Sequence, residues 1–277
     1  MAMSANTLTD AEASLRAGDP DAALARLQAA VRSQPGNAKL RVFLFQLLAV
    51  LGQWERALNQ LNVATELDAS TLAMAQMYRE TLRCELLRNE VFAGKRVPLL
   101  FGEPDQWVAL LLESLLTAGR GDKAAAARLR EQAFELAPAT AGRLDDGAFA
   151  WLADADARLG PMCEAVINGR YYWLPFSRLA SIAIEAPADL RDFVWTPAHF
   201  TFTNGGEAVG VIPTRYPGSE SSADGTIKLA RRTEWLEQDG DYLGLGQRLL
   251  VTDAGEYPLL DIRRIEFDTA PAEPVDG

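Results

Sequence analysis

The chain has 277 residues, of which 48% are hydrophobic and 23% are charged. This ordinary globular mixture excludes a disordered or collagen-like chain, and no apolar run reaches the roughly 18 residues that a membrane helix needs. The net charge of -11 argues against a nucleic-acid binder, which would show a basic face.

The first ten residues, MAMSANTLTD, hold neither a basic region nor an apolar stretch, so they do not read as a secretion signal. We therefore expect a cytoplasmic protein. The two cysteines, Cys84 and Cys163, form no CxxC pair and are expected to be buried thiols. The sequence thus offers neither a disulfide framework nor a zinc ribbon.

The N-terminal half contains an internal repeat. GDPDAALARLQAAVRSQP, from Gly18, matches GQWERALNQLNVATELDA, from Gly52, with an offset of 34 at every matching position. A third copy, GDKAAAARLREQAFELAP, begins at Gly121. This period predicts antiparallel helix pairs resembling tetratricopeptide repeats, with each glycine at the turn between two helices.

The first helix of each pair is expected over 8–17, 38–51 and 107–118, and a further long helix is expected over 70–88. The segment 89–107 contains four glycines and prolines that forbid a continuous helix, so a loop replaces the next helix of the array. Such a break either carries function or marks a degenerate repeat.

Stacked helical repeats form a curved surface whose concave side commonly holds a peptide or a partner helix. If the array is regular, its inward face takes residues from the second and third copies, which are either partner contacts or ordinary core: Val42, Phe43, Gln46, Val50, Leu111, Leu112 and Leu115.

One more helix is expected over 145–159, after which the apolar period changes to two. The pair Asn168 and Gly169 lies between two strand-like runs and predicts a tight hairpin. Further strands are expected over 180–186, 200–203, 207–213, 227–236, 242–252 and 259–267. Short strands with glycine and proline between them predict a small barrel or sandwich.

Charge follows the same division. Residues 1–140 are nearly neutral, whereas residues 141–277 hold almost the whole negative charge. The sequence therefore predicts an α+β protein with a tetratricopeptide-like helical domain over 1–144 and a compact strand-rich domain over 145–268. The proline-rich acidic tail, 269–277, is expected to be disordered.

Aromatic residues gather in the strand-rich half. Tyr172, Trp173 and Trp195 are either an aromatic docking surface or a second packed layer. The single histidine, His199, is expected to have a structural role, and it is also a candidate for partner contact. An alternative is an enzyme of this half that uses His199 with nearby carboxylates.

No cofactor or metal motif is complete. GLGQRL, from Gly244, lacks the third glycine of a dinucleotide fingerprint. DGDYLG, from Asp239, opens like a calcium loop but has Leu250 where the bidentate glutamate belongs. We therefore expect no catalytic site, cofactor or metal.

Seven strings carry a resemblance to a known family: KRVPLLFGEP, WLADADARLGP, NGRYYWLPF, DFVWTPAHFTFTNGGEAVGVIPTRYPGSE, ARRTEW, YLGLGQRLL and DAGEYPLLDIR. They span essentially the whole chain, which resembles the TagJ family of type VI secretion accessory proteins, also called ImpE or SciE-type virulence proteins.

The resemblance implies a cytoplasmic, non-enzymatic component of a contractile injection machine. Family members bind the N-terminal helix of the small sheath subunit TssB and are linked to sheath handling by the ATPase ClpV. Neither domain is favoured as the binding site. Apart from the enzyme hypothesis, a purely structural dimer brace is the remaining alternative.

Overall fold

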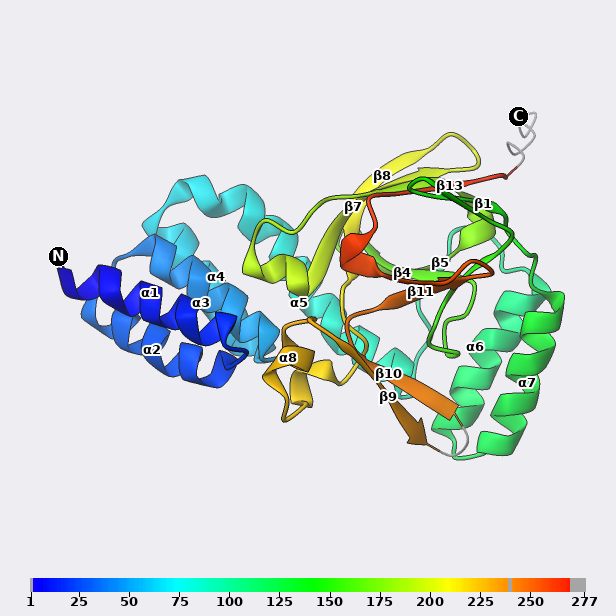
Figure 1. Ribbon diagram of the computed structural model, residues 1–277, viewed down its shortest axis with the longest axis horizontal. Helices are drawn as coiled ribbons and strands as arrows, with labels where there is room; N and C mark the ends of the chain where they lie inside the picture. The colour runs from blue at the N-terminus through cyan, green and yellow to red at the C-terminus, as the bar shows by residue number, and fades with distance from the viewer. Residues whose placement is uncertain (1, 239–240, 270–277) are drawn as a thin grey trace.

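The computed structural model describes residues 2–238 and 241–269 (Figure 1). The N-terminal part consists of α-helices: α1 (Ala2–Arg16), α2 (Pro20–Ser33), α3 (Ala38–Val50), α4 (Trp54–Leu67), α5 (Leu72–Phe92), α6 (Gln106–Gly119) and α7 (Lys123–Leu136). Helices α1 to α4 form two antiparallel pairs. The predicted turn glycines Gly18, Gly52 and Gly121 all have positive φ, which confirms the turns.

The rest of the chain is mainly strands: β1 (Gly142–Leu144), β2 (Gly147–Phe149), β3 (Leu152–Asp154), β4 (Met162–Ile167), β5 (Arg170–Pro175), β6 (Leu179–Ile184), β7 (Trp195–Phe202), β8 (Glu207–Pro213), β9 (Thr233–Gln238), β10 (Asp241–Gly246), β11 (Leu249–Thr252), β12 (Glu256–Pro258) and β13 (Arg264–Phe267). Eight form one antiparallel sheet in the order β2-β1-β13-β6-β7-β8-β4-β5. Three form a smaller sheet, β12-β11-β3, and β9 pairs with β10.

The two larger sheets share a core. Leu152 of β3 and Leu250 of β11 are buried with Phe200 and Ile265 of the eight-stranded sheet. The arrangement is sandwich-like and not a closed barrel, so the predicted combination of helical repeats and a strand-rich part is confirmed. Asn168 and Gly169 both have positive φ and connect β4 to β5 as predicted.

A second core joins the helices to the other face of the large sheet. Tyr171 and Trp173 of β5 and Val211 of β8 are buried with residues of α3 and α5. Helix α5 runs from the repeats to the strands across the middle of the molecule (Figure 1). The two parts are therefore packed together through a continuous apolar core.

Two arginines from the segment 214–232 hold the repeats in place. The Arg215 guanidinium donates to the carbonyl oxygen of Val50 at 2.7 Å, at the end of α3. Arg231 donates to the carbonyl oxygens of Leu15 and Arg16, at 2.7 and 2.9 Å, at the end of α1. Because the last carbonyls of a helix lack partners within the helix, each arginine caps one repeat.

Several expectations about elements are wrong. The strand expected over 242–252 is two strands of different sheets, β10 and β11, and 259–267 begins with a 3-10 turn, so that β13 starts only at Arg264. The segment 145–159 is no helix, because it contains β2, β3 and the turns around them. Within 227–236, the first residues belong to the short helix α8 (Gly225–Lys228), and the strand β9 starts only at Thr233. The third repeat copy does form the pair α6 and α7, but this pair lies on the far side of the strands from α1 to α4 (Figure 1). The three copies therefore form no single superhelix.

The change from helices to strands falls between Leu136 and Gly142. The division into domains over 1–144 and 145–268 stays a prediction. The tail 269–277 is expected to be disordered. Its residues 270–277 lie outside the described part of the chain. Thr269 donates from its hydroxyl to the carbonyl oxygen of Leu179 at 3.2 Å.

Candidate functional site

A groove of about 870 Å³ lies on the repeats, where residues of α1, α3 and the turn 68–71 between α4 and α5 face a loop between β6 and β7. Its lining comprises Glu12, Leu15, Arg16, Ala38, Lys39, Val42, Phe43, Gln46, Asp68, Ser70, Thr71, Pro187, Ala188, Asp189, Leu190 and Phe193. Its exposed surface is mainly apolar.

The sequence of α3 explains the apolar floor. Leu44, Phe45 and Leu48 of this helix are buried in the core between the helices. Val42 and Phe43 are half-buried and line the groove, and Phe43 also packs against the edge of this core. The nearly all-round apolar pattern of α3 therefore serves two surfaces, one packed and one open.

The loop that forms the opposite wall is fixed by polar contacts. It contains the 3-10 turn η3 (Leu190–Phe193), which is closed by a capping box between Asp189 and Asp192. The Arg191 guanidinium lies 5.0 Å from the centre of the Tyr78 ring on α5 and donates to the sulfur of Met74 at 2.9 Å. The wall is thus anchored to the repeats themselves.

The residues predicted for the inward face of the repeats lie at three different locations in the structure. Val42, Phe43 and Gln46 meet in the groove, whereas Val50 has no exposed surface. Leu111 and Leu115 line another pocket, of about 350 Å³, between α6 and the β9–β10 hairpin. Half-buried Leu112 packs against the core of the helices.

The aromatic candidates of the strand-rich part are not brought together on an exposed surface. Trp173 and Trp195 are fully buried, and the Trp195 indole N–H donates to Glu85 of α5 at 2.7 Å. Tyr172 is half-buried and stacks on Phe101 with ring centres 4.5 Å apart. The sequence left open whether these aromatic residues form a docking surface or a second packed layer. Both tryptophans belong to a packed layer.

His199 lies on the outer face of β7, where 42% of its side chain is exposed. Its Nε2 is 3.6 Å from a carboxylate oxygen of Glu207, which is itself 65% exposed. Within the described residues, no group of three or more His, Cys, Asp or Glu side chains is placed to hold a metal ion.

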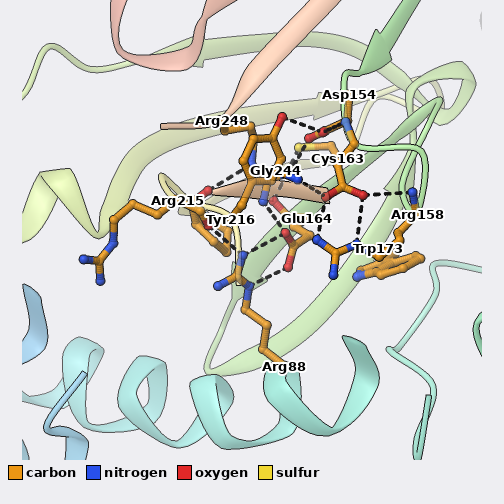
Figure 2. Close-up of polar contacts among 12 residues, drawn as sticks. Arg88, Asp154, Arg158, Cys163, Glu164, Trp173, Arg215, Tyr216, Gly244 and Arg248 are labelled. Atoms are coloured by element: carbon orange, nitrogen blue, oxygen red, sulfur yellow. Dashed lines mark hydrogen bonds and ion pairs between the residues drawn. The ribbon is translucent and has the colours of Figure 1, made fainter. Parts of the chain in front are cut away.

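Sequence reasoning missed a buried network of charges between α5 and the strands (Figure 2). Arg88 of α5 donates from Nε and Nη2 to the two carboxylate oxygens of Glu164 on β4, at 2.7 and 3.1 Å. Arg248 pairs with Glu164 and with Asp154 on β3, and the Tyr171 hydroxyl also bonds to Glu164. All five side chains are buried.

Burial and the neighbouring arginines shift the pKa values of the carboxylates in this network in opposite directions. Burial acts to raise the pKa of Glu164, but the guanidinium groups of Arg88 and Arg248 outweigh it and hold this pKa at about 2. Burial dominates at Asp154 and raises its pKa to about 6, despite the pairing with Arg248. The hollow beside both carboxylates holds about 10 Å³, roughly one water molecule.

A hollow of that size admits no substrate, so the network acts as a joint between α5 and two sheets. Its members lie far apart in the chain, and the only local signal is the pair Asp154 and Asp156. Asp156 is buried as well and accepts hydrogen bonds from Arg158. Buried charges that find partners from distant segments leave no periodic trace in a sequence.

None of the described helices is long and apolar enough to cross a membrane. Two family models match the chain. The tetratricopeptide repeat model covers residues 14–79, and the ImpE protein model covers residues 146–266. The first match includes α3 of the groove floor, and the second spans most of the strand-rich part.

Similar proteins cover nearly the whole chain. The type VI secretion system accessory component TagJ of Pseudomonas aeruginosa is 54% identical over 262 residues, which is 95% of this chain and 92% of that protein. The crystal structure of a Vibrio parahaemolyticus protein superposes with a TM-score of 0.84 at 27% identity, over 93% of this chain and 97% of that one. The chain therefore belongs to the ImpE family of type VI secretion accessory components, to which TagJ belongs.

Proposed function

We propose that this chain is a non-enzymatic, cytoplasmic adaptor of the type VI secretion system that binds the N-terminal helix of the small sheath subunit TssB. The site is the groove between the repeats and the β6–β7 loop. The observation that carries the proposal is this apolar groove of about 870 Å³ on tetratricopeptide-like helices.

The lining of the groove suits one face of a helix. An α-helix with its side chains is about 10–12 Å across and buries one apolar face in such a site. Val42 and Phe43 on one side and Leu190 and Phe193 on the other offer apolar contacts for that face. The charged side chains of Lys39, Asp68 and Asp189 also line the groove, so the polar face of the helix would stay in contact with charged groups and water.

Both parts of the chain contribute to the groove, because α1 and α3 supply the floor and the β6–β7 loop supplies a wall. In this proposal, residues from both parts of the chain therefore bind the helix. By holding the TssB helix, the adaptor would link the sheath subunit to assembly or to ClpV-dependent disassembly.

The absence of catalysis in this proposal is supported by two placements. The hollow beside the buried carboxylates Asp154 and Glu164 holds only about 10 Å³, and His199 and Glu207 lie exposed on the outside of the sheet, at 42% and 65%. Acid–base catalysis needs a titratable group beside a space that holds the substrate, and neither the packed charge network nor the exposed histidine provides such a pair.

A titration tests the proposal. A fluorescent peptide of the TssB N-terminus is titrated with the full chain, and anisotropy is expected to rise to saturation with a dissociation constant in the micromolar range. A scrambled peptide of the same composition is the control. A linear, unsaturated signal up to hundreds of micromolar would sink the proposal.

A further inference from the structure

We propose that strand β9 is a docking edge for another protein, which supplies an extended segment of alternating basic and apolar residues. This strand belongs to the β9–β10 hairpin, which projects from the strand-rich part of the molecule (Figure 1). The lining of the groove contains no residue of β9. Strand docking and helix binding can therefore be tested separately.

The main chain of β9 is paired on one side and open on the other. In the described part of the chain, β9 pairs with β10 alone, and Trp235 lies opposite Gly244. Gly244 and Gly246 of β10 donate their N–H groups away from β9, to Asp156 at 3.1 Å and to Ser219 at 2.8 Å. Antiparallel pairs alternate between bonded and non-bonded ones, so the pair of Trp235 and Gly244 is a non-bonded one. The N–H and C=O groups of Trp235 therefore point away from β10.

The same alternation applies two residues later, where Glu237 lies opposite Tyr242. Among the residues that the structure describes, no hydrogen bond reaches the main-chain N–H or C=O group of Trp235 or Glu237. Both residues are exposed, as are Leu236 and Gln238 of the same strand. Such an open edge is a template for another strand.

Large apolar side chains lie on both faces of this edge. Trp235 and Leu236 are 37% and 48% exposed, and consecutive residues of a strand point to opposite faces. Tyr242 of β10 is 59% exposed and shares its face with Trp235. The ring centre of Trp235 is 5.6 Å from that of buried Tyr216, which holds the indole in place. Fixed, exposed apolar side chains beside an open edge are typical of a protein contact.

The charge of the edge indicates what kind of segment docks there. The segment 233–241 holds four acidic residues and no basic one. Glu237 has no ion-pair partner among the residues that the structure describes. A second copy of this chain, with its net charge of -11, would bring acidic residues against acidic ones. The charge therefore favours a basic segment of a different protein.

The sequence pattern of the partner follows from the two faces of β9. Antiparallel pairing is the more stable arrangement per residue, and it places one partner residue opposite each residue of β9. A lysine or arginine opposite Glu237 gains both the carboxylate and the nearby rings of Trp235 and Tyr242. The residue opposite Leu236 points to the other face and is apolar. A segment that alternates lysine with valine meets both requirements.

A peptide titration tests the proposal. The probe is a fluorescent hexapeptide that alternates lysine with valine, and the full chain is added to it. We expect saturable binding with a dissociation constant of about 0.1–1 mM, because one short strand buries less area than a stable interface. Two control peptides should show no saturable binding. One has glutamate in place of every lysine, and the other is methylated on the lysine amides, which face β9 in antiparallel pairing.

Two substitutions of Glu237 separate main-chain pairing from charge. Its N–H group points away from β10, so Glu237→Pro removes a docking donor and no hydrogen bond of the hairpin. Glu237→Pro should weaken peptide binding about tenfold, whereas Glu237→Gln should weaken it only about threefold. Glu66→Gln, at an exposed glutamate of α4, should bind like the wild type. Circular dichroism checks that each variant is folded.

Hydrogen exchange of the wild-type chain gives a second measurement. The amides of Trp235 and Glu237 should exchange fast in the free chain and at least about tenfold more slowly with saturating peptide. The amide of Leu236, which faces β10, should not change. Absence of saturable binding would overturn the proposal, and so would equal affinities of folded Glu237→Pro and Glu237→Gln. Binding without slower exchange at Trp235 and Glu237 would overturn it too, since the peptide would then lie elsewhere.

Discussion

Arg88 and Glu164 lie 76 residues apart in sequence, and the guanidinium of the first donates to both carboxylate oxygens of the second in the buried interior. Arg88 stands on α5 and Glu164 on β4, so this pair ties the helices to the large sheet (Figure 2). Such a contact sets how the groove wall faces the groove floor.

Arg88→Ala should lower the free energy of unfolding by about 3–5 kcal/mol, because buried Glu85 loses its ion pair and buried Glu164 loses one of its two guanidinium partners. Arg88→Lys keeps the charge but loses the two-pronged contact, so it should fall between the wild type and Arg88→Ala. Urea unfolding followed by far-UV circular dichroism measures both. A loss below about 1 kcal/mol for Arg88→Ala would contradict the assigned role.

Acid should unfold the chain partly through Glu164. Its folded pKa of about 2 lies below the value of roughly 4.3 for an unfolded glutamate, so its contribution is complete above pH 4.3 and is lost as the pH falls towards 2. The size of that contribution is about 3 kcal/mol.

The test compares the free energy of unfolding of the wild type and Glu164→Gln between pH 7 and pH 3. Glu164→Gln should be less stable at pH 7 and should lose less stability on acidification. Parallel curves for the two proteins would contradict the assignment of the low pKa to Glu164.

The turn glycines offer a matched pair of substitutions. Gly52 and Gly121 have φ of +66° and +95°, so an alanine is strained at either, by about 1–2 kcal/mol. A Cβ at Gly52 would also collide with the side chain of Glu220, whereas one at Gly121 meets nothing within 4 Å.

Gly52→Ala should therefore lower the melting temperature by several degrees more than Gly121→Ala. Differential scanning calorimetry decides this. Equal shifts would mean that the 214–232 segment yields easily and does not fix the repeats.

Much of this architecture could be predicted from local patterns. The 34-residue offset located the turns at Gly18 and Gly52, and the pair Asn168 and Gly169 located the β4–β5 hairpin. These features depend on residues adjacent in sequence, so single-sequence reasoning reaches them.

Other features could not be predicted from the sequence, because they depend on contacts between residues that are far apart in the chain. The strand β3 was mistaken for helix, since its inward residues include Asp154 and its outward ones include Ala153, the reverse of the usual pattern. The inward aspartate is stabilised by Arg248, which no local window contains. For the same reason the position of α6 and α7 away from the first two repeats could not be foreseen.

The enzyme hypothesis makes a separate prediction. If His199 served catalysis, His199→Ala would abolish secretion while the fold survived. We expect this variant to restore a deletion strain to wild-type secretion, because the His199 side chain is 42% exposed and its ion pair is with the exposed Glu207. Loss of secretion at normal protein levels would revive the hypothesis.

The most direct test of the adaptor function is a comparison of two charge insertions in the peptide titration. Phe43→Asp puts a carboxylate on the groove floor, and Leu86→Asp puts one on an exposed part of α5 outside the groove. Both chains are first shown to be folded by circular dichroism. We predict that Phe43→Asp weakens binding of the TssB peptide at least about a hundredfold, as expected for a buried unpaired charge, while Leu86→Asp binds like the wild type. Wild-type affinity in the folded Phe43→Asp chain would contradict the account.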